Sequence, residues 1–191
     1  MPGRENQKAR TRKALVDACR ELTRSGHEVT MPKIAERAMV SEATAYRYFP
    51  DLVSLLQEAL AGLWPAPEEA LAPVAGSPDP AERVAFAAEY LLQGVHAYEG
   101  SVRAMIAHTL TVPGAAKARP GIRFGLIDYA LAPFEDVLPA EDMARLKVDL
   151  AVPVSAEAFF TLTDLCGLPP AEAAASAART AATLTRAAFA R

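Results

Sequence analysis

Basic side chains near the N-terminus are the residues whose types and spacing first suggest a chemistry. Five of them follow closely on one another, with Glu5 as the one acid among them: Arg4, Lys8, Arg10, Arg12 and Lys13. Such a cluster favours a polyanion as the binding partner. A solvated basic face on a first helix would carry the same charges, so charge alone leaves both interpretations open.

Catalytic and metal-binding patterns are missing from the sequence. It contains no Gly-x-Ser-x-Gly, no His-Glu-x-x-His and no phosphate-binding glycine loop, and it has three histidines. His96 and His108 lie too far apart to suggest a metal site without a third ligand. We therefore expect no enzyme activity, no metal and no cofactor. A small-molecule enzyme with a helical core remains the alternative, which turnover on a panel of metabolites would reveal.

The elements that must position the N-terminal side chains are short helices. One apolar face, with Leu15, Cys19 and Leu22, predicts a helix over 6–25. Thr30 can cap a second helix and Ser41 a third, which runs from Glu42 to Tyr48.

The second and third helices form a helix-turn-helix. Its small core contains Ile34, Val40, Ala45 and Phe49. The face of the third helix that stays exposed is then free to enter the major groove of DNA; its residues are Glu42, Ala43, Thr44, Tyr46 and Arg47. Arg47 is a candidate contact to a base or a phosphate because of this exposure.

This segment resembles the TetR family of bacterial transcriptional regulators. The chain reads Ile-Ala-Glu-Arg-Ala-Met-Val-Ser over 34–41, then Thr-Ala-Tyr-Arg-Tyr-Phe over 44–49, then Asp51. The resemblance covers about residues 10–60. It implies phosphate contacts from Thr30, Ser41, Tyr46 and Tyr48, with Thr44 near the DNA. Arg10 and Lys33 complete the candidate DNA contacts.

Two residues depart from the family pattern. Met39 stands where the family has glycine in the turn, and a left-handed backbone there would cost about 1 kcal/mol. Leu52 stands where the family often has a lysine that contacts a phosphate. If these changes weaken DNA binding, the chain would be a helical adaptor or small-molecule-binding protein, which is the second alternative.

The rest of the chain predicts an all-α fold. With 51% hydrophobic residues and a net charge of -3, the chain has enough apolar surface for a core. We expect about nine helices, over 6–25, 30–38, 42–48, 52–62, 80–98, 101–112, 122–135, 140–165 and 171–189. Pro153 should kink or split the eighth. Proline-rich 64–80 is predicted to be a linker, 113–121 a loop and 167–170 a break.

Two domains follow from this pattern: a DNA-binding domain over 1–52 and a helical ligand-binding and dimerisation domain over 53–191. Without a signal peptide or an 18-residue apolar run, we expect the chain in the cytoplasm and not in a membrane. Cys19 and Cys166 are predicted to be buried free thiols.

In the second domain, aromatic and polarisable residues could line a mostly apolar pocket for a small-molecule effector, as in regulators that this chain resembles. The candidates are Phe86, Tyr90, Met105, His108, Phe124, Tyr129 and Phe159. An ordinary helical core would show the same spacing.

The last two helices could form a homodimer interface. Their candidate contacts are Ala174, Ala178, Ala181, Ala188, Phe159, Phe160, Leu162 and Leu184. An internal helix of high propensity would also explain the alanines. The predicted protein is a homodimeric transcriptional regulator, a repressor that a small apolar ligand releases from a palindromic operator in double-stranded DNA.

Overall fold

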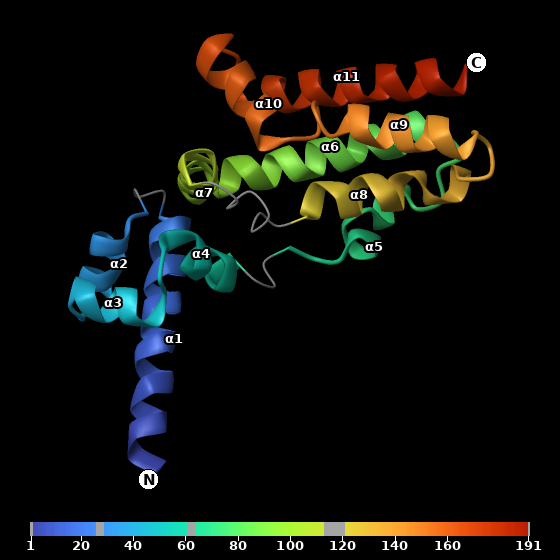
Figure 1. Cartoon of the computed structure of the whole chain (residues 1–191). Helices are drawn as coiled ribbons and strands as arrows, with labels where there is room; N and C mark the ends of the chain where they lie inside the picture. The colour runs from blue at the N-terminus through green and yellow to red at the C-terminus, as the bar shows by residue number, and fades with distance from the viewer. Residues whose placement is uncertain (1, 26–28, 61–63, 113–120, 191) are drawn as a thin grey trace. The chain divides into compact units, whose positions relative to one another are not determined.

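The computed structural model describes residues 2–25, 29–60, 64–112 and 121–190, with side chains from Asn6 onward. These residues form helices and turns without a strand, which confirms the all-α class. The chain divides into two compact units (Figure 1): Met1–Trp64 with Tyr98–Pro120, and Pro65–Ala97 with Gly121–Arg191. These units are defined by internal packing and not by function. They therefore do not test the predicted boundary between the two functional domains after residue 52, which stays an expectation.

The first unit contains five helices, one of which comes from much later in the chain. They are α1 (Pro2–Arg24), α2 (Met31–Arg37), α3 (Glu42–Tyr48), α4 (Leu52–Leu60) and α7 (Glu99–Thr111). α1 packs against α2 and α4, α2 against α3, and α4 against α7. Their shared core includes Leu15, Ile34, Phe49, Leu56 and Met105. The N-terminal half of α1 projects beyond the other helices of this unit (Figure 1).

A buried hydrogen bond fixes α7 in the first unit. The hydroxyl oxygens of Thr23 on α1 and Ser101 on α7 are 2.7 Å apart. Thr23 is 5% exposed and Ser101 is fully buried. Since buried hydroxyl groups need partners, the two side chains partner each other, and the Thr23 hydroxyl also donates to the Cys19 carbonyl at 2.8 Å.

The second unit contains the longest described helix after α1, together with several short ones. Its elements are α5 (Pro67–Ala70), η1 (Ala72–Val74), α6 (Pro80–Ala97), α8 (Ile122–Leu131), η3 (Ala132–Phe134), α9 (Ala140–Leu150), α10 (Ala156–Phe160), η4 (Thr161–Leu165) and α11 (Pro170–Phe189). α6 packs between α11 and α8, and α9 packs on both α8 and α11 (Figure 1).

The alanine-rich face of α11 is buried within this unit. Its buried residues are Ala173, Ala174, Ala177, Ala178, Ala181, Ala182 and Thr185. They pack mainly on α6, whose own buried face includes Ala81, Ala87 and Ala88. Small side chains on both helices allow the axes to approach closely. Ala174, Ala178 and Ala181 therefore serve internal packing, and their assignment to a dimer interface is wrong.

A buried arginine holds α6 to neighbouring segments of the second unit. Arg83 is 2% exposed, and its guanidinium donates to four backbone carbonyls. The acceptors are Ala130 at 2.8 Å, Val74 at 2.9 Å, Ala75 at 2.6 Å and Tyr129 at 3.1 Å. The arginine thus ties the end of η1 and the last turn of α8 to α6.

One predicted segment needs correction, and one predicted break is confirmed. The segment 64–80 is not only a linker, because Pro67 starts the short helix α5 and Ala72–Val74 form a helical turn. The helix over 140–165 is split at Pro153 as expected, with Pro153 buried between α9 and α10 and the Ser155 hydroxyl capping α10. The described residues therefore hold eleven α-helices rather than nine.

Gly167 confirms the predicted break before α11. Its φ of 68° lies in the left-handed region, which glycine adopts without a steric penalty. The predicted loop over 113–121 lies outside the described residues except for Gly121.

The two cysteines differ in their surroundings. Cys19 is a buried free thiol, and burial raises its pKa to about 11. Cys166 is free but exposed, because it follows η4 at the surface, so its predicted burial is wrong.

Candidate nucleic-acid interface

α3 is held by its ends and has one buried residue. Ser41 accepts a hydrogen bond from the Thr44 amide at 3.2 Å, which confirms it as the cap of this helix. Only Ala45 within the helix is buried, while Phe49 directly after it is 1% exposed. α3 therefore keeps most of its surface for an external partner.

Met39 forms the turn that directs α3 away from α2. Its φ is 55°, in the left-handed region that favours glycine. The amide of Val40 donates to Ala35 and the amide of Met39 donates to Glu36, each at 3.0 Å. This pair of bonds is a Schellman motif with Met39 at the left-handed position. The methionine side chain is 91% exposed, so packing does not offset the backbone strain.

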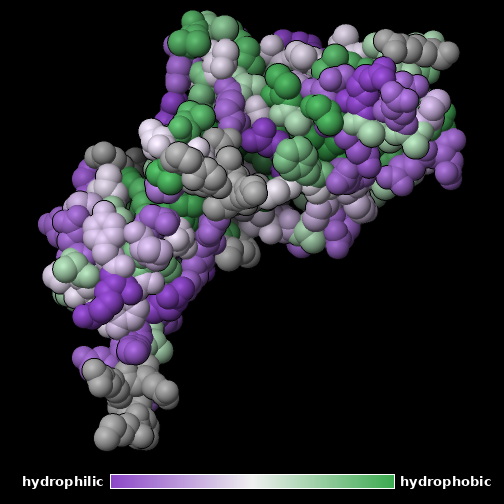
Figure 2. Space-filling model, in the orientation of Figure 1, coloured by the Kyte–Doolittle hydropathy of each residue, from purple (hydrophilic) through white to green (hydrophobic). Residues whose placement is uncertain are grey.

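The candidate residues on α1, α2 and α3 lie in one unit, and several are exposed. Arg10, Lys33, Ser41, Tyr46 and Arg47 are exposed, Tyr46 at 46%. The guanidinium of Arg47 lies 5.6 Å from the centroid of the Tyr48 ring. Figure 2 shows the visible face of this unit around α2 and α3 as mostly polar. A polar surface with cations fits a phosphate backbone.

The remaining candidates are half-buried. Thr44 bonds to the Ser41 hydroxyl at 2.9 Å, and Tyr48 packs against the core of the unit. Thr30 precedes α2 at the capping position, but its side chain makes no capping hydrogen bond. Both predicted caps stand directly before their helices. Ser41 makes a capping hydrogen bond with its side chain, whereas Thr30 does not.

A groove of about 890 Å³ runs between α1 and α3. Its lining residues are Gln7, Lys8, Ala9, Thr11, Arg12, Val40, Thr44, Arg47 and Tyr48. The groove joins the projecting half of α1 to the exposed face of α3. Gln7 and Thr11 were not singled out in the sequence, because their place beside α3 depends on how the helices cross.

The start of α4 is fixed by Asp51. Its carboxylate accepts from the Ser54 amide at 2.7 Å and the Ser54 hydroxyl at 2.8 Å. Burial alone would raise the pKa of Asp51, but the hydrogen bonds from Ser54, the charge of His108 and the Val53 amide together lower it. Leu52 is half-buried against the core. Its apolar side chain has no donor for a phosphate.

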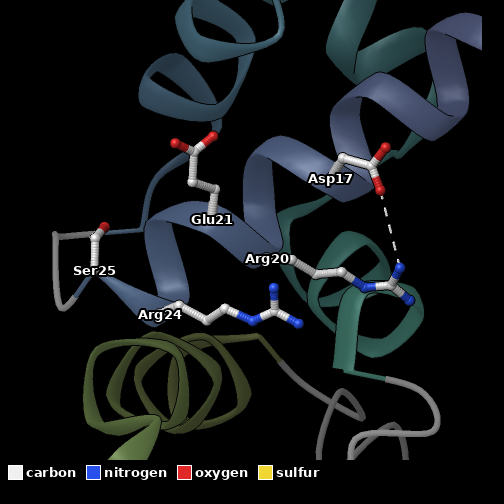
Figure 3. A pocket seen from close by; sticks show the side chains of 5 residues that line it. All are labelled: Asp17, Arg20, Glu21, Arg24 and Ser25. Carbon is white, nitrogen blue, oxygen red and sulfur yellow. Dashed lines mark ion pairs between the residues drawn. The ribbon is translucent and has the colours of Figure 1, made fainter.

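A second hollow, of about 550 Å³, lies along α1 (Figure 3). The guanidinium of Arg20 lies 3.9 Å from the carboxylate of Asp17 and donates to the Ala59 carbonyl at 2.8 Å. Glu21 points to a different side of the helix (Figure 3). It forms an ion pair with Arg37 on α2. Because these groups brace α1 against α2 and α4, we assign the hollow to packing rather than to ligand binding.

The candidate effector residues are divided between the two units. Met105 and His108 belong to the first unit, and the others belong to the second. Within the second unit, Phe159 is 1% exposed whereas Phe124 is 54% exposed. A hollow of about 790 Å³ over α9, α10 and α11 is lined by none of the seven residues. The effector site stays a prediction.

Comparison with known proteins finds a match within the first unit. Residues 15–59 match the family described as bacterial regulatory proteins, tetR family. The match spans α2, α3, most of α4 and the C-terminal part of α1, and it supports a DNA-binding transcriptional regulator of that family. No curated protein matches the chain. No helix among the described residues is long and apolar enough to cross a membrane.

Proposed function

Because its first unit carries the N-terminal domain of tetR-family regulators, we propose that this chain is a homodimeric repressor that binds a palindromic operator. The exposed face of α3 carries the proposal, since the helix is fixed at both ends and offers Tyr46 and Arg47 to a partner. Phosphate contacts would set the register of the protein on DNA, and contacts from α3 to base edges would supply sequence preference.

A palindromic DNA fragment from the region upstream of its own gene tests this proposal. We expect the purified protein to retard this fragment, with an affinity that falls as salt rises. Replacing Tyr46 and Arg47 together by alanine should weaken binding by about a hundredfold without destabilising the fold, because both side chains are exposed. Replacing the exposed residues Glu141 and Arg145 of α9 by alanine is the control.

Two other outcomes of this experiment would change the conclusion. Unchanged affinity in the double α3 variant would show that this helix is not the reading element. Weak binding to every sequence at low salt would favour the adaptor alternative, which the strained Met39 and the half-buried Leu52 support.

We place the dimer contact on the outer face of α10, η4 and α11. Leu162 and Leu184 are half-buried and line the 790 Å³ hollow, and Leu165 is 82% exposed nearby in sequence. Figure 2 shows apolar surface where α10 continues into α11. An apolar patch of this kind is typical of an interface with another protein. Phe159, which the sequence suggested as a dimer contact, is too buried to touch a second copy of the chain. In this proposal Leu162, Leu165 and Leu184 make the apolar contacts instead.

Sedimentation of charged variants tests the dimer. Replacing Leu162 and Leu184 by aspartate should yield monomers that lose affinity for the palindrome, since one recognition helix then binds alone. Val137→Asp puts a charge on a valine that is exposed outside α10 and α11, and it should remain dimeric. Monomeric wild-type protein would contradict this arrangement.

The proposed effector is a small and mostly apolar molecule bound by the second unit. It would release the DNA by favouring a conformation in which the two recognition helices no longer fit one operator. A thermal-shift screen of apolar metabolites should find a compound that raises the melting temperature. The same compound should dissociate the complex with DNA, and a binder that leaves this complex intact would not be the effector.

A further inference from the structure

Arg12 joins three helices of the first unit. From α1, its Nε donates to Glu58 Oε1 on α4 at 3.0 Å, and its Nη2 forms an ion pair with the other carboxylate oxygen. Its Nη1 donates to the backbone carbonyl of Tyr48 at 3.3 Å, at the end of α3. The guanidinium carbon lies 4.4 Å from the centroid of the Phe49 ring.

Two of these contacts, with the Tyr48 carbonyl and the Phe49 ring, act on the C-terminal end of α3. The last carbonyls of a helix lack partners within the helix, and a cation there is favourable for the helix dipole. The Phe49 ring is almost fully buried, so stacking on it holds the guanidinium in one orientation. Glu58 then fixes the opposite edge of the guanidinium through two hydrogen bonds.

The neighbouring cation on α1 is engaged differently. Lys13 pairs with Asp17 one turn further along the same helix, at 2.5 Å. That pair stays within α1, whereas the contacts of Arg12 reach residues 36 and 46 positions away in the chain. The basic cluster at the N-terminus thus contains an arginine whose charge is balanced by Glu58.

We propose that Arg12 is a positioning residue that clamps the end of the recognition helix to α1 and α4, and that it does not bind phosphate. The proposal rests on the proposed DNA binding by α3. Ser41 fixes the beginning of α3, and Arg12 fixes its end. The angle at which α3 meets DNA then depends on the Arg12–Glu58 pair.

A different role for Arg12 makes the opposite prediction. Arg12 also lines the groove beside Lys8 and Arg47, where a phosphate could draw it away from Glu58. In that case Glu58 competes with DNA, and its removal strengthens binding. If Arg12 clamps α3, removal of Glu58 weakens binding although it removes a negative charge.

The experiment measures DNA affinity and its salt dependence for E58Q and R12K. The probe is a duplex selected by the wild-type protein from a random-sequence library, and the temperature is one at which circular dichroism shows every variant folded. We expect both variants to lose affinity by about fivefold to tenfold. Lysine keeps the charge of Arg12 but cannot stack and bond in two directions at once. The salt slope of E58Q should equal that of wild type.

Glu21→Gln is the matched control. Glu21 also lies on the surface of this unit and pairs with an arginine, Arg37, but that pair joins α1 to α2 without touching α3. Its removal changes the charge equally and should leave the affinity within about twofold.

Three results would overturn the proposal. Tighter binding by E58Q, with a salt slope steeper by about 0.9, would make Arg12 a phosphate ligand. Wild-type affinity in R12K, together with tighter binding by E58Q, would support the same conclusion. Unchanged affinity in both variants with lowered melting temperatures would reduce the pair to a stabilising contact. If the wild-type protein selects no duplex, the proposed DNA binding itself fails, and that outcome is distinct from all three.

Discussion

α3 and α11 both contain alanines, yet the two helices are held in place in different ways. α3 buries one of its seven residues and is fixed by Ser41 at its beginning and by Arg12 at its end. α11 buries seven of its twenty residues along one face against α6. A helix held by its ends keeps its faces free for a partner, whereas a helix held by one face loses that face to the core.

This difference predicts how each region responds to substitution. Substitutions of buried residues in the second unit, where α11 is held by one face, should lower the free energy of unfolding strongly. They disturb buried volume and buried hydrogen bonds. Changes at the ends of α3 should each be small, since a cap contributes about 1 kcal/mol. The sole tryptophan, Trp64, packs on Tyr98 and reports on the first unit, while circular dichroism reports on both.

The largest effect is expected for Arg83→Met. The four carbonyls that Arg83 satisfies would lose this donor inside the second unit. We expect the free energy of unfolding to fall by about 3 kcal/mol, measured by urea titration with circular dichroism. Arg179→Met, at an exposed position of α11, is the control. A loss below about 1 kcal/mol, which is the size of a surface effect, would contradict the role of Arg83.

Ala181→Leu tests the close approach of α6 and α11. Ala181 is fully buried, so a larger side chain should force the helices apart and lower stability by about 2 kcal/mol. Ala187→Leu makes the same change at an exposed position and should be nearly neutral. Equal stability of the two variants in urea would mean that the alanine face is not tightly packed.

Ser41→Ala should remove the cap of α3 and lower the stability of the first unit by about 1 kcal/mol. Thr30→Ala is the matched comparison, because Thr30 occupies the same position before α2 without a capping hydrogen bond. The stability lost in Thr30→Ala should be smaller than that lost in Ser41→Ala. Urea unfolding followed by Trp64 fluorescence measures both, and a larger loss for Thr30→Ala would reverse the assignment.

Met39→Gly should act in the opposite direction. Glycine adopts the left-handed backbone without the steric penalty, so the first unit should gain about 1 kcal/mol. The Trp64 transition in urea should move to higher concentration. No gain would show that the turn relaxes to another conformation in solution.

The smallest effect concerns Asp51 and pH. Its pKa is lower in the folded protein than in the unfolded chain, so its charge stabilises the fold above the unfolded pKa of about 4. This contribution is lost as the pH falls through the lower pKa of the folded state. Wild type should exceed Asp51→Asn in stability by less than about 1 kcal/mol at pH 7, and the difference should vanish at low pH. A difference that grows on acidification would contradict this linkage.

The helix-turn-helix was predictable because its signals are local. Ser41, Pro50 and Asp51 mark the ends of helices within a few residues, and the apolar positions Ile34, Ala45 and Phe49 proved to be buried. The interactions of Arg12 were not predictable, since its partners lie 36 and 46 residues away. The sequence shows that Arg12 is charged, but it does not show that Glu58 lies beside it.

In the second unit, the sequence predicted where the helices lie better than it predicted which face of each helix is buried. The alanines of α11 fit both an interface and internal packing, and only the position of α6 decides between them. The start of α5 could have been noticed, because Pro67 followed by Glu68 and Glu69 is typical of a first helical turn. The density of prolines around it outweighed that signal.

The discontinuity of the first unit restricts how this protein can be recombined. The chain passes between the units at residues 64–65, 97–98 and 120–121. A chimera that joins residues 1–60 to another regulator would lack Ser101 and Met105, so the Thr23 hydroxyl would keep its bond to the Cys19 carbonyl but lose its bond to Ser101. During synthesis, likewise, the core of this unit is incomplete until α7 has left the ribosome. Exchange of DNA specificity between proteins of this architecture should therefore proceed by substitution on the surface of α3, not by transfer of a continuous segment.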